Sequence, residues 1–444
     1  MMSWFPFRGY HPVMTTWTSR TLGSACAIAM AWGTLRAQEK PPADLLRDSA
    51  VRAAIAWSKV NESQAIDDQI RFCEVPAPPF KESARAEVLR QSFEQLGLRN
   101  VRIDRAGNVL GDRPGAAARP HLVIAAHLDT VFPEDTDVKV KRDGALLQGP
   151  GIGDDCRGLA LLVAIIRSLR HASVQTPGSM TFVATVGEEG LGDLRGVKEL
   201  FGVANRPSPA AQGAGAPATD VDRFLAIDGT GLGIANVAVG SRRYRVTFKG
   251  PGGHSFAAFG FANPIDAMGR AIAKIAEFQV PTEPKTTFNV GRVGGGTSVN
   301  AIPSDAWMEV DLRSSDTASL ASLDLKLQKA VDAAVVEENE RWRAPRMITV
   351  VKDRVGDRPA GATPADSPVV RIAEAVHKAL GLPFTLSESS TDSNVPMSLH
   401  IPAITIGAGG RGTGAHAVTE SFDTTDSWIG TERALLLTIA LAQK

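Results

Sequence analysis

The stretch from His121 to Gly190 constrains the fold of this 444-residue chain more than any other part of the sequence. It contains two short apolar segments, HLVIAA (121–126) and MTFVATV (180–186), and each is typical of a buried β-strand. Side chains that can bind a metal ion follow these segments directly: His127, Asp129, Glu188 and Glu189. In an open α/β sheet, ligands collect beyond the carboxyl ends of such strands. The stretch therefore predicts an α/β fold with a metal site at one edge of its sheet.

Further residues with ligand atoms stand in glycine-rich turns elsewhere in the chain. Asp154 and Asp155 end the loop GPGIGDD in front of an apolar helix, Asp228 closes the segment RFLAIDG, and His416 lies in the loop GAGGRGTGAHAVTE. Each has an ordinary explanation when taken alone, because aspartates cap helices and polar side chains favour exposed turns. The functional alternative for Asp154–Asp155 is a carboxylate that spans two cations about 3.5–4 Å apart.

In each of two short pairs of residues, one member could bind a cation while the other has a supporting or proton-accepting role. His127 and Asp129 stand on the same side of a strand end, so Asp129 is expected to orient the ring of His127 as a metal ligand. Glu188 and Glu189 point to opposite sides, so one could bind metal while the other accepts a proton from water. A solvated acidic turn explains the glutamate pair equally well.

The candidate metal ligands form a set of mixed nitrogen and oxygen donors without a thiolate group. Such a set suits zinc, with manganese or cobalt as alternatives. The sequence contains no HExxH, CxxC, GxSxG or Walker motif that would support a different chemistry. The set comprises His127, Asp154, Glu189, Asp228 and His416.

The pattern of predicted elements changes near Val239. From there the order becomes β-α-β-β-α-β, which is ferredoxin-like and extends over residues 239–355. We therefore expect a main domain in two parts, 38–238 and 356–444, interrupted by this inserted domain. Because such units expose edge strands, a homodimer formed through the inserted domain is an open alternative to a monomer.

Residues 1–37 have the pattern of an export signal. Arg8 and Arg20 precede the apolar run LGSACAIAMAWGTL, and a cleavage point follows near Ala37. The run of 14 residues is too short for a stable membrane span. We expect the protein to be exported, to a periplasm or to the outside of the cell. A disordered N-terminal extension is the alternative.

The charge balance and the cysteines add two further expectations. Lys and Arg number 48, as do Asp and Glu, and a net charge of zero argues against nucleic acid as a partner. Signal cleavage would leave Cys73 and Cys156, whose pairing the sequence leaves open. Cys156 is expected to be a small buried apolar residue, with a reactive thiol near Asp154 as the alternative.

From about Arg71 onward the chain resembles the dinuclear zinc exopeptidases and amidohydrolases. This family includes peptidase T, glutamate carboxypeptidase, aminoacylase and succinyl-diaminopimelate desuccinylase. The resemblance implies an α/β catalytic domain with a mostly parallel mixed sheet and an inserted ferredoxin-like lid or dimerisation domain. It rests on the stretches HLDT, GPGIGDD, GEEG, AIDGT, GGHS, TSVNAIP with the later DLR, and GAHAVTE.

The resemblance also implies a role for each residue of the candidate site. Asp154 would bridge two zinc ions, one completed by His127 and Asp228 and the other by Glu189 and His416. The remaining roles would be a general base at Glu188, a residue supporting His127 at Asp129, an oxyanion-stabilising histidine at His254, and substrate contacts at Asn300 and Arg313.

The expected function is hydrolysis of an amide bond by a metal-activated water. A short peptide cleaved at one end, by an aminopeptidase or a di- or tripeptidase, is the first choice of substrate. An N-acyl amino acid, cleaved by a deacylase, is the second choice, because the same metal chemistry serves both. A non-catalytic binding protein on the same fold is the least favoured alternative.

Overall fold

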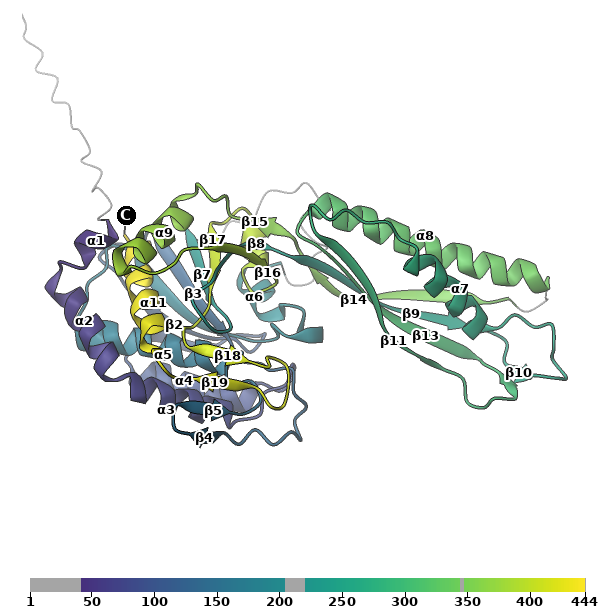
Figure 1. Cartoon of the computed structure of the whole chain (residues 1–444), viewed down its shortest axis with the longest axis horizontal. Coiled ribbons are helices and arrows are strands. Elements are labelled where there is room, and N and C mark those ends of the chain that lie inside the picture. Colours follow the sequence, from purple (N-terminus) through teal and green to yellow (C-terminus); the bar gives the residue numbers. More distant parts are fainter. Residues whose placement is uncertain (1–40, 204–219, 344–346, 444) are drawn as a thin grey trace, which may run out of the picture. The chain divides into compact units, whose positions relative to one another are not determined.

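A computed structural model describes residues 41–203, 220–343 and 347–443. The predicted export signal (1–37) lies outside these residues. The main domain is built on a mixed sheet of nine strands in the order β1-β2-β6-β3-β7-β17-β8-β15, with β16 beside β8 (Figure 1). Its bounds are β1 (Arg99–Ile103), β2 (Val109–Arg113), β3 (His121–His127), β6 (Ser179–Thr185), β7 (Arg223–Ile227), β8 (Ile234–Ala238), β15 (Gly361–Ala362), β16 (Leu386–Ser389) and β17 (Ala403–Ile406).

The four central strands, β6, β3, β7 and β17, run parallel. Their side chains alternate between two apolar cores, because successive residues of a strand point to opposite faces. In β3, Leu122 and Ile124 belong to one core, and Val123 and Ala125 belong to the other. Both faces of these strands are therefore buried, which explains their almost continuous apolar sequences.

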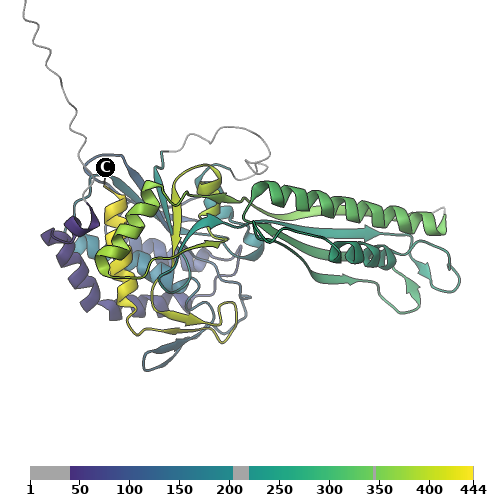
Figure 2. The same ribbon diagram turned by 45° about the horizontal axis from the view of Figure 1, so that its top comes forward.

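Helices cover both faces of this sheet (Figures 1 and 2). One core takes its apolar side chains mainly from α1 (Pro42–Leu45), α2 (Ser49–Val60), α4 (Ser83–Gln95), α5 (Cys156–His171), α9 (Pro368–Leu380) and α11 (Trp428–Leu441). The other core takes them from α6 (Arg195–Leu200) and α10 (Asn394–Ser398). The predicted fold class, α/β with a mixed sheet, agrees with this arrangement.

A small second sheet, which the sequence did not predict, holds two loops of the candidate site. Its four strands pair in the order β18-β19-β5-β4. The GPGIGDD loop leaves β5, and the loop that carries His416 joins β18 to β19. The bounds are β4 (Lys141–Asp143), β5 (Leu146–Gln148), β18 (Arg411–Thr413) and β19 (Ser421–Asp423).

The inserted domain has the predicted order β-α-β-β-α-β. Its four-stranded antiparallel sheet has the order β11-β13-β9-β14, and α7 and α8 cover one face of it (Figures 1 and 2). The short strand β10, which follows β9, pairs with β12, which follows β11. The bounds are β9 (Gly240–Lys249), β10 (Gly253–His254), α7 (Pro264–Ala276), β11 (Thr286–Gly295), β12 (Ala301–Ile302), β13 (Asp305–Ser314), α8 (Thr317–Trp342) and β14 (Thr349–Arg358).

Cys73 and Cys156 form a disulfide. Cys73 ends α3 (Glu62–Cys73), Cys156 begins α5, and both are buried in a small apolar cluster with Ile152 and Phe422. Cys156 is therefore buried, as expected, but it is not a free thiol, and the reactive-thiol alternative is wrong. The two cysteines are separated by 83 residues in the sequence and meet only in the fold.

Within the described parts of the chain, no helix combines the length and the apolar character that crossing a membrane requires.

Candidate functional site

The structure brings the five predicted metal ligands together at the carboxyl ends of the central strands. His127 ends β3, Asp228 follows β7, and Glu189 follows β6 after a turn. Asp154 precedes α5, and His416 comes from the loop between β18 and β19. Strands far apart in the sequence thus deliver their terminal side chains to one sheet edge, as the parallel order of these strands predicts.

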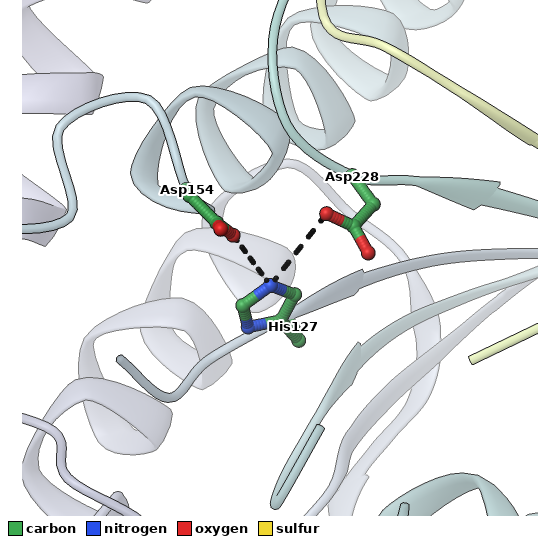
Figure 3. Close-up of side chains that lie close together, drawn as sticks. All are labelled: His127, Asp154 and Asp228. Carbon is green, nitrogen blue, oxygen red and sulfur yellow. Dashed lines mark hydrogen bonds and ion pairs between the residues drawn. The ribbon is translucent and has the colours of Figure 1, made fainter. Parts of the chain in front are cut away.

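Asp154 lies between the two histidines. Its Oδ1 is 3.0 Å from Nε2 of His127, and its Oδ2 is 3.3 Å from Nε2 of His416. Asp228 Oδ1 lies 3.9 Å from the same nitrogen of His127, and Glu189 Oε1 lies 3.0 Å from Nε2 of His416. Figure 3 shows the carboxylates of Asp154 and Asp228 directed toward the ring of His127.

Three groups of side chains could each hold a cation, and one of them is His127, Glu188 and Glu189. The other two overlap at Asp154: His127, Asp154 and Asp228 form one, Asp154, Glu189 and His416 form the other, and within each group the ligand atoms lie within 4.8 Å of one another. Asp154 belongs to both and offers one oxygen to each. Nitrogen and oxygen donors in this arrangement fit two divalent cations of the zinc type that share a bridging carboxylate.

The main chain of Asp129, rather than its carboxylate, orients the ring of His127. The carbonyl oxygen of Asp129 lies 2.9 Å from His127 Nδ1, whereas its carboxylate oxygen Oδ1 is 3.8 Å away. The carboxylate instead accepts hydrogen bonds from the backbone N–H groups of Glu188, at 3.0 Å, and Glu189, at 2.8 Å. The sequence predicts that the Asp129 side chain supports His127, but in the structure this carboxylate supports the two glutamates. Their backbone N–H groups are buried and need hydrogen-bond acceptors, which the carboxylate supplies.

Two further carboxylates hold the loop that carries Asp154. Asp155 caps α5 by accepting from the N–H of Gly158, and it also accepts from the N–H of His127. Glu420 accepts from three backbone N–H groups of the loop, those of Gly151, Gly153 and Asp154. Asp155 therefore fills the capping role that its sequence position allowed, while Asp154 remains directed at the histidines.

Glu188 lies beside the candidate ligands in a common pocket. Its buried carboxylate accepts a hydrogen bond from Arg358 at 3.0 Å. Burial raises the pKa of Glu188, and the charge of Arg358 opposes that rise. The pocket lining contains acidic side chains, among them Asp154 and Asp228, and also the cationic side chains of Arg243, Arg313 and Arg358.

The predicted residues of the inserted domain separate into two places. Arg313 lines the pocket, as a substrate contact should. Among the described residues, neither His254 nor Asn300 is part of the pocket lining. These two lie together beyond the end of β9, where Ser255 N–H donates to the carbonyl oxygen of Asn300 and His254 pairs with Ala301. The strand β9 is about 30 Å long at 3.3 Å per residue, and His254 lies beyond its far end. His254 is therefore distant from the start of β9, where the inserted domain meets the pocket.

Sequence reasoning missed Glu420, Arg358 and Asp392. Glu420 stands four residues after His416 and ends the stretch GAHAVTE, so its position in that stretch is a signal for it. Arg358 and Asp392 had no local signal. Asp392 is buried beside Thr185, whose hydroxyl donates to it, and burial raises the pKa of its carboxyl to about 7.

Without cations, protons on the histidines offset the negative charge of the site. Burial opposes protonation of His127, but its hydrogen bond to Asp154 and the charges of Asp155 and Asp228 outweigh burial and raise its pKa well above the usual value. Hydrogen bonds to Asp154 and Glu189 raise the pKa of His416 to about 10.

Comparisons with known sequences identify a peptidase family and relatives of this chain. A sequence model described as peptidase family M20/M25/M40 matches residues 123–440. The uncharacterised protein YqjE of Bacillus subtilis is 25% identical over 373 residues, which cover 79% of this chain and 91% of that protein. A succinyl-diaminopimelate desuccinylase of Bordetella avium is 26% identical over 280 residues, which cover 58% of this chain and 69% of that enzyme.

Solved structures share the fold. An aminopeptidase PepT from Bacillus cereus superposes with a TM-score of 0.67 at 21% identity, over 86% of this chain and 99% of that one. A tripeptidase from Staphylococcus aureus gives a TM-score of 0.69 at 20% identity, over the same shares of the two chains. This likeness confirms the predicted fold class.

Metal binding is expected to release protons. A histidine must lose its proton to become a ligand, and the raised pKa values of His127 and His416 keep both rings protonated near pH 7 in the metal-free protein. Burial and the charge of Asp154 also raise the pKa of Asp228 well above its usual value. Zinc titrated into metal-free protein at pH 7 should therefore release at least two protons, and the apparent affinity should rise with pH. Calorimetry in buffers of different ionisation enthalpy measures this release.

The matched control is His400→Asn, which removes an exposed histidine outside the site and should leave the proton release unchanged. A binding heat that does not depend on the buffer would contradict the assignment of the two histidines as ligands.

Proposed function

The chain belongs to peptidase family M20/M25/M40, and on that premise we propose that it is a metal-dependent hydrolase that cleaves the terminal amide bond of a short peptide. Membership confirms the family resemblance found in the sequence. The geometry that carries the proposal is the pair of overlapping ligand groups around Asp154, with Glu188 at their side.

We assign His127, Asp154 and Asp228 to one cation and Asp154, Glu189 and His416 to the other. Zinc is the first choice, and manganese and cobalt are the alternatives. Two such cations, when bound, supply Lewis-acid polarisation of the scissile carbonyl and lower the pKa of the attacking water. The nitrogen and oxygen donors of the two groups support this choice.

Glu188 is proposed as the proton carrier. One of its oxygens is engaged by Arg358, which leaves the other for a water proton. After attack on the carbonyl carbon, the same carboxyl group would return that proton to the leaving amine, so that the amide C–N bond breaks with protons balanced. The Asp129 carboxylate, which accepts from the Glu188 N–H, holds this residue in place.

The cationic wall of the pocket supports a substrate that carries a carboxylate. Among the described residues, Arg243 and Arg313 share one counterion there, Asp311, with Nε to carboxylate distances of 3.2 and 2.7 Å. A free peptide C-terminus or the carboxylate of an N-acyl amino acid would supply the missing negative charge. The peptide is preferred because the similar solved structures include an aminopeptidase and a tripeptidase, whereas the desuccinylase relative favours the acyl substrate.

A homodimer is proposed to complete the site with His254. In its own chain His254 lies about one strand length from the root of the inserted domain, that is, from the end that joins the main domain. We therefore propose that the His254 side chain reaches the pocket of a second copy. The edge strand β11 and the exposed side chains of Phe256, Phe259 and Val299 supply surface for such pairing.

Export is proposed from the pattern of residues 1–37. The disulfide between Cys73 and Cys156 supports it, because such bonds persist in oxidising compartments outside the cytosol.

Replacement of Glu188 tests the function. The metal-loaded protein should hydrolyse members of a panel of di- and tripeptides and N-acetyl and N-succinyl amino acids. Glu188→Ala should retain bound metal and lose turnover by a factor of about 10²–10⁴, because only the proton transfer is removed. Asp154→Ala, the control, should lose both metal and turnover. Most of the activity remaining in Glu188→Ala would refute the base assignment, and absence of both metal and hydrolysis would favour a binding protein.

Mixing two inactive variants tests the dimer. If His254 acts across the interface, dimers that combine Glu188→Ala with His254→Ala contain one intact site of two. Random exchange makes half of the dimers mixed, so about one quarter of the wild-type activity should return. No recovery after exchange, or a monomer by light scattering, would contradict the proposal.

Mass spectrometry of protein from the host's periplasm or medium tests export. We expect an N-terminus near Gln38 and no free thiol at Cys73 or Cys156. Reduction should lower the free energy of unfolding by about 2–5 kcal/mol, but leave a Cys73→Ser/Cys156→Ser variant unaffected. A chain that still begins at Met1 would count against export.

A further inference from the structure

Arg358 holds the proposed base from the root of the inserted domain. It is the last residue of β14. Its Nη1 donates to Glu188 Oε1 at 3.0 Å and to the Ser390 hydroxyl at 3.1 Å, and its Nη2 donates to the main-chain oxygen of Glu188. The side chains are 4% and 6% exposed. The guanidinium therefore contacts both the carboxylate and the backbone of one residue.

Two more contacts join the root of the inserted domain to the same loop. The backbone N–H of Asp357 donates to Asp193 Oδ1 at 2.9 Å. Arg243, on β9, donates from Nη1 to the carbonyl oxygen of Gly190 at 2.5 Å. The segment 188–193, which also carries Glu189, is thus fastened to two adjacent strands of the inserted sheet.

This ion pair is poorly explained as a device for stability. Burying two charges costs several kcal/mol per ion, and their attraction repays the cost only when every hydrogen-bonding group is satisfied. Arg358 Nε is buried and has no hydrogen-bond partner among the described residues. A planar guanidinium does, however, fix a carboxylate through its rigid set of donors, which a lysine ammonium cannot reproduce.

We propose that Arg358 is a positioning residue for Glu188. It holds Oε1 of Glu188, so that Oε2 faces the pocket. Because Arg358 stands at the end of β14, the orientation of the base depends on the position of the inserted domain. The proposal rests on the proposed function, in which Glu188 carries the proton.

Kinetics of three variants test it. In Arg358→Gln, kcat should fall on the order of 100-fold, as expected for a misplaced catalytic group, while KM and the number of bound metal ions stay nearly unchanged. Arg358→Lys should recover part of the loss. Arg358→Ala should regain turnover when free guanidinium is added.

Arg354→Gln is the matched control. Arg354 lies on the same strand and forms an ion pair with Asp357 at 2.6 Å, but it is half exposed and makes no contact with Glu188 among the described residues. This variant should keep its kcat and should not respond to guanidinium.

Crystal structures of the wild type and Arg358→Gln, both in the metal-free state, give a readout independent of activity. The Glu188 carboxylate should hold one orientation in the wild type and be displaced in the variant. An unmoved carboxylate, or a kcat within about twofold of wild type while Glu188→Ala is inactive, would overturn the proposal. Failure of the proposed function looks different, because then the wild type itself hydrolyses nothing on the panel and Glu188→Ala changes nothing.

Discussion

The Asp154 carboxylate lies between two histidine rings, 3.0 Å from one and 3.3 Å from the other, and the whole site depends on this sharing. Like charges gathered in a buried pocket repel one another unless protons, arginines or cations compensate them. In the protein alone the compensation comes from His127, His416 and Arg358. Two divalent cations, when bound, would replace the histidine protons as the positive charges that compensate the carboxylates. Metal binding is therefore linked to loss of these protons.

The chain holds this repulsive cluster in place with backbone hydrogen bonds to carboxylates that are not among the five candidate ligands. Asp129 accepts from the N–H groups of the glutamate turn, Asp155 from that of His127, and Glu420 from three in the aspartate loop. Each of these carboxylates fixes the backbone next to a candidate ligand, which in turn fixes the direction of the ligand side chain. Pre-organisation of this kind means that little rearrangement is needed when ions bind.

Candidate ligands that stand in a recognisable local sequence pattern could be predicted from the sequence. His127, Asp154 and Glu189 each follow an apolar run or a glycine turn, and the parallel order of the strands brings them to one edge. The Cys73–Cys156 disulfide, the carbonyl of Asp129 as the partner of His127, and Arg358 beside Glu188 could not be predicted, because each depends on a contact between distant segments or on main-chain geometry. The β5–β19 sheet was missed for the same reason, since strands of three residues carry too little periodicity to recognise.

The inserted domain presents different chemistry at its two ends. Its root carries Arg243, Arg313 and Arg358, which face the pocket of their own chain, whereas its tip carries His254 and Asn300, about 30 Å along β9. A rigid antiparallel sheet of that length can serve its own active site only with the root. If the tip acts in catalysis, it must act on a second copy or after a large movement of the domain. The root is hydrogen-bonded to the loop of Glu188, so a movement of the whole domain would also change the contacts that hold the proposed base.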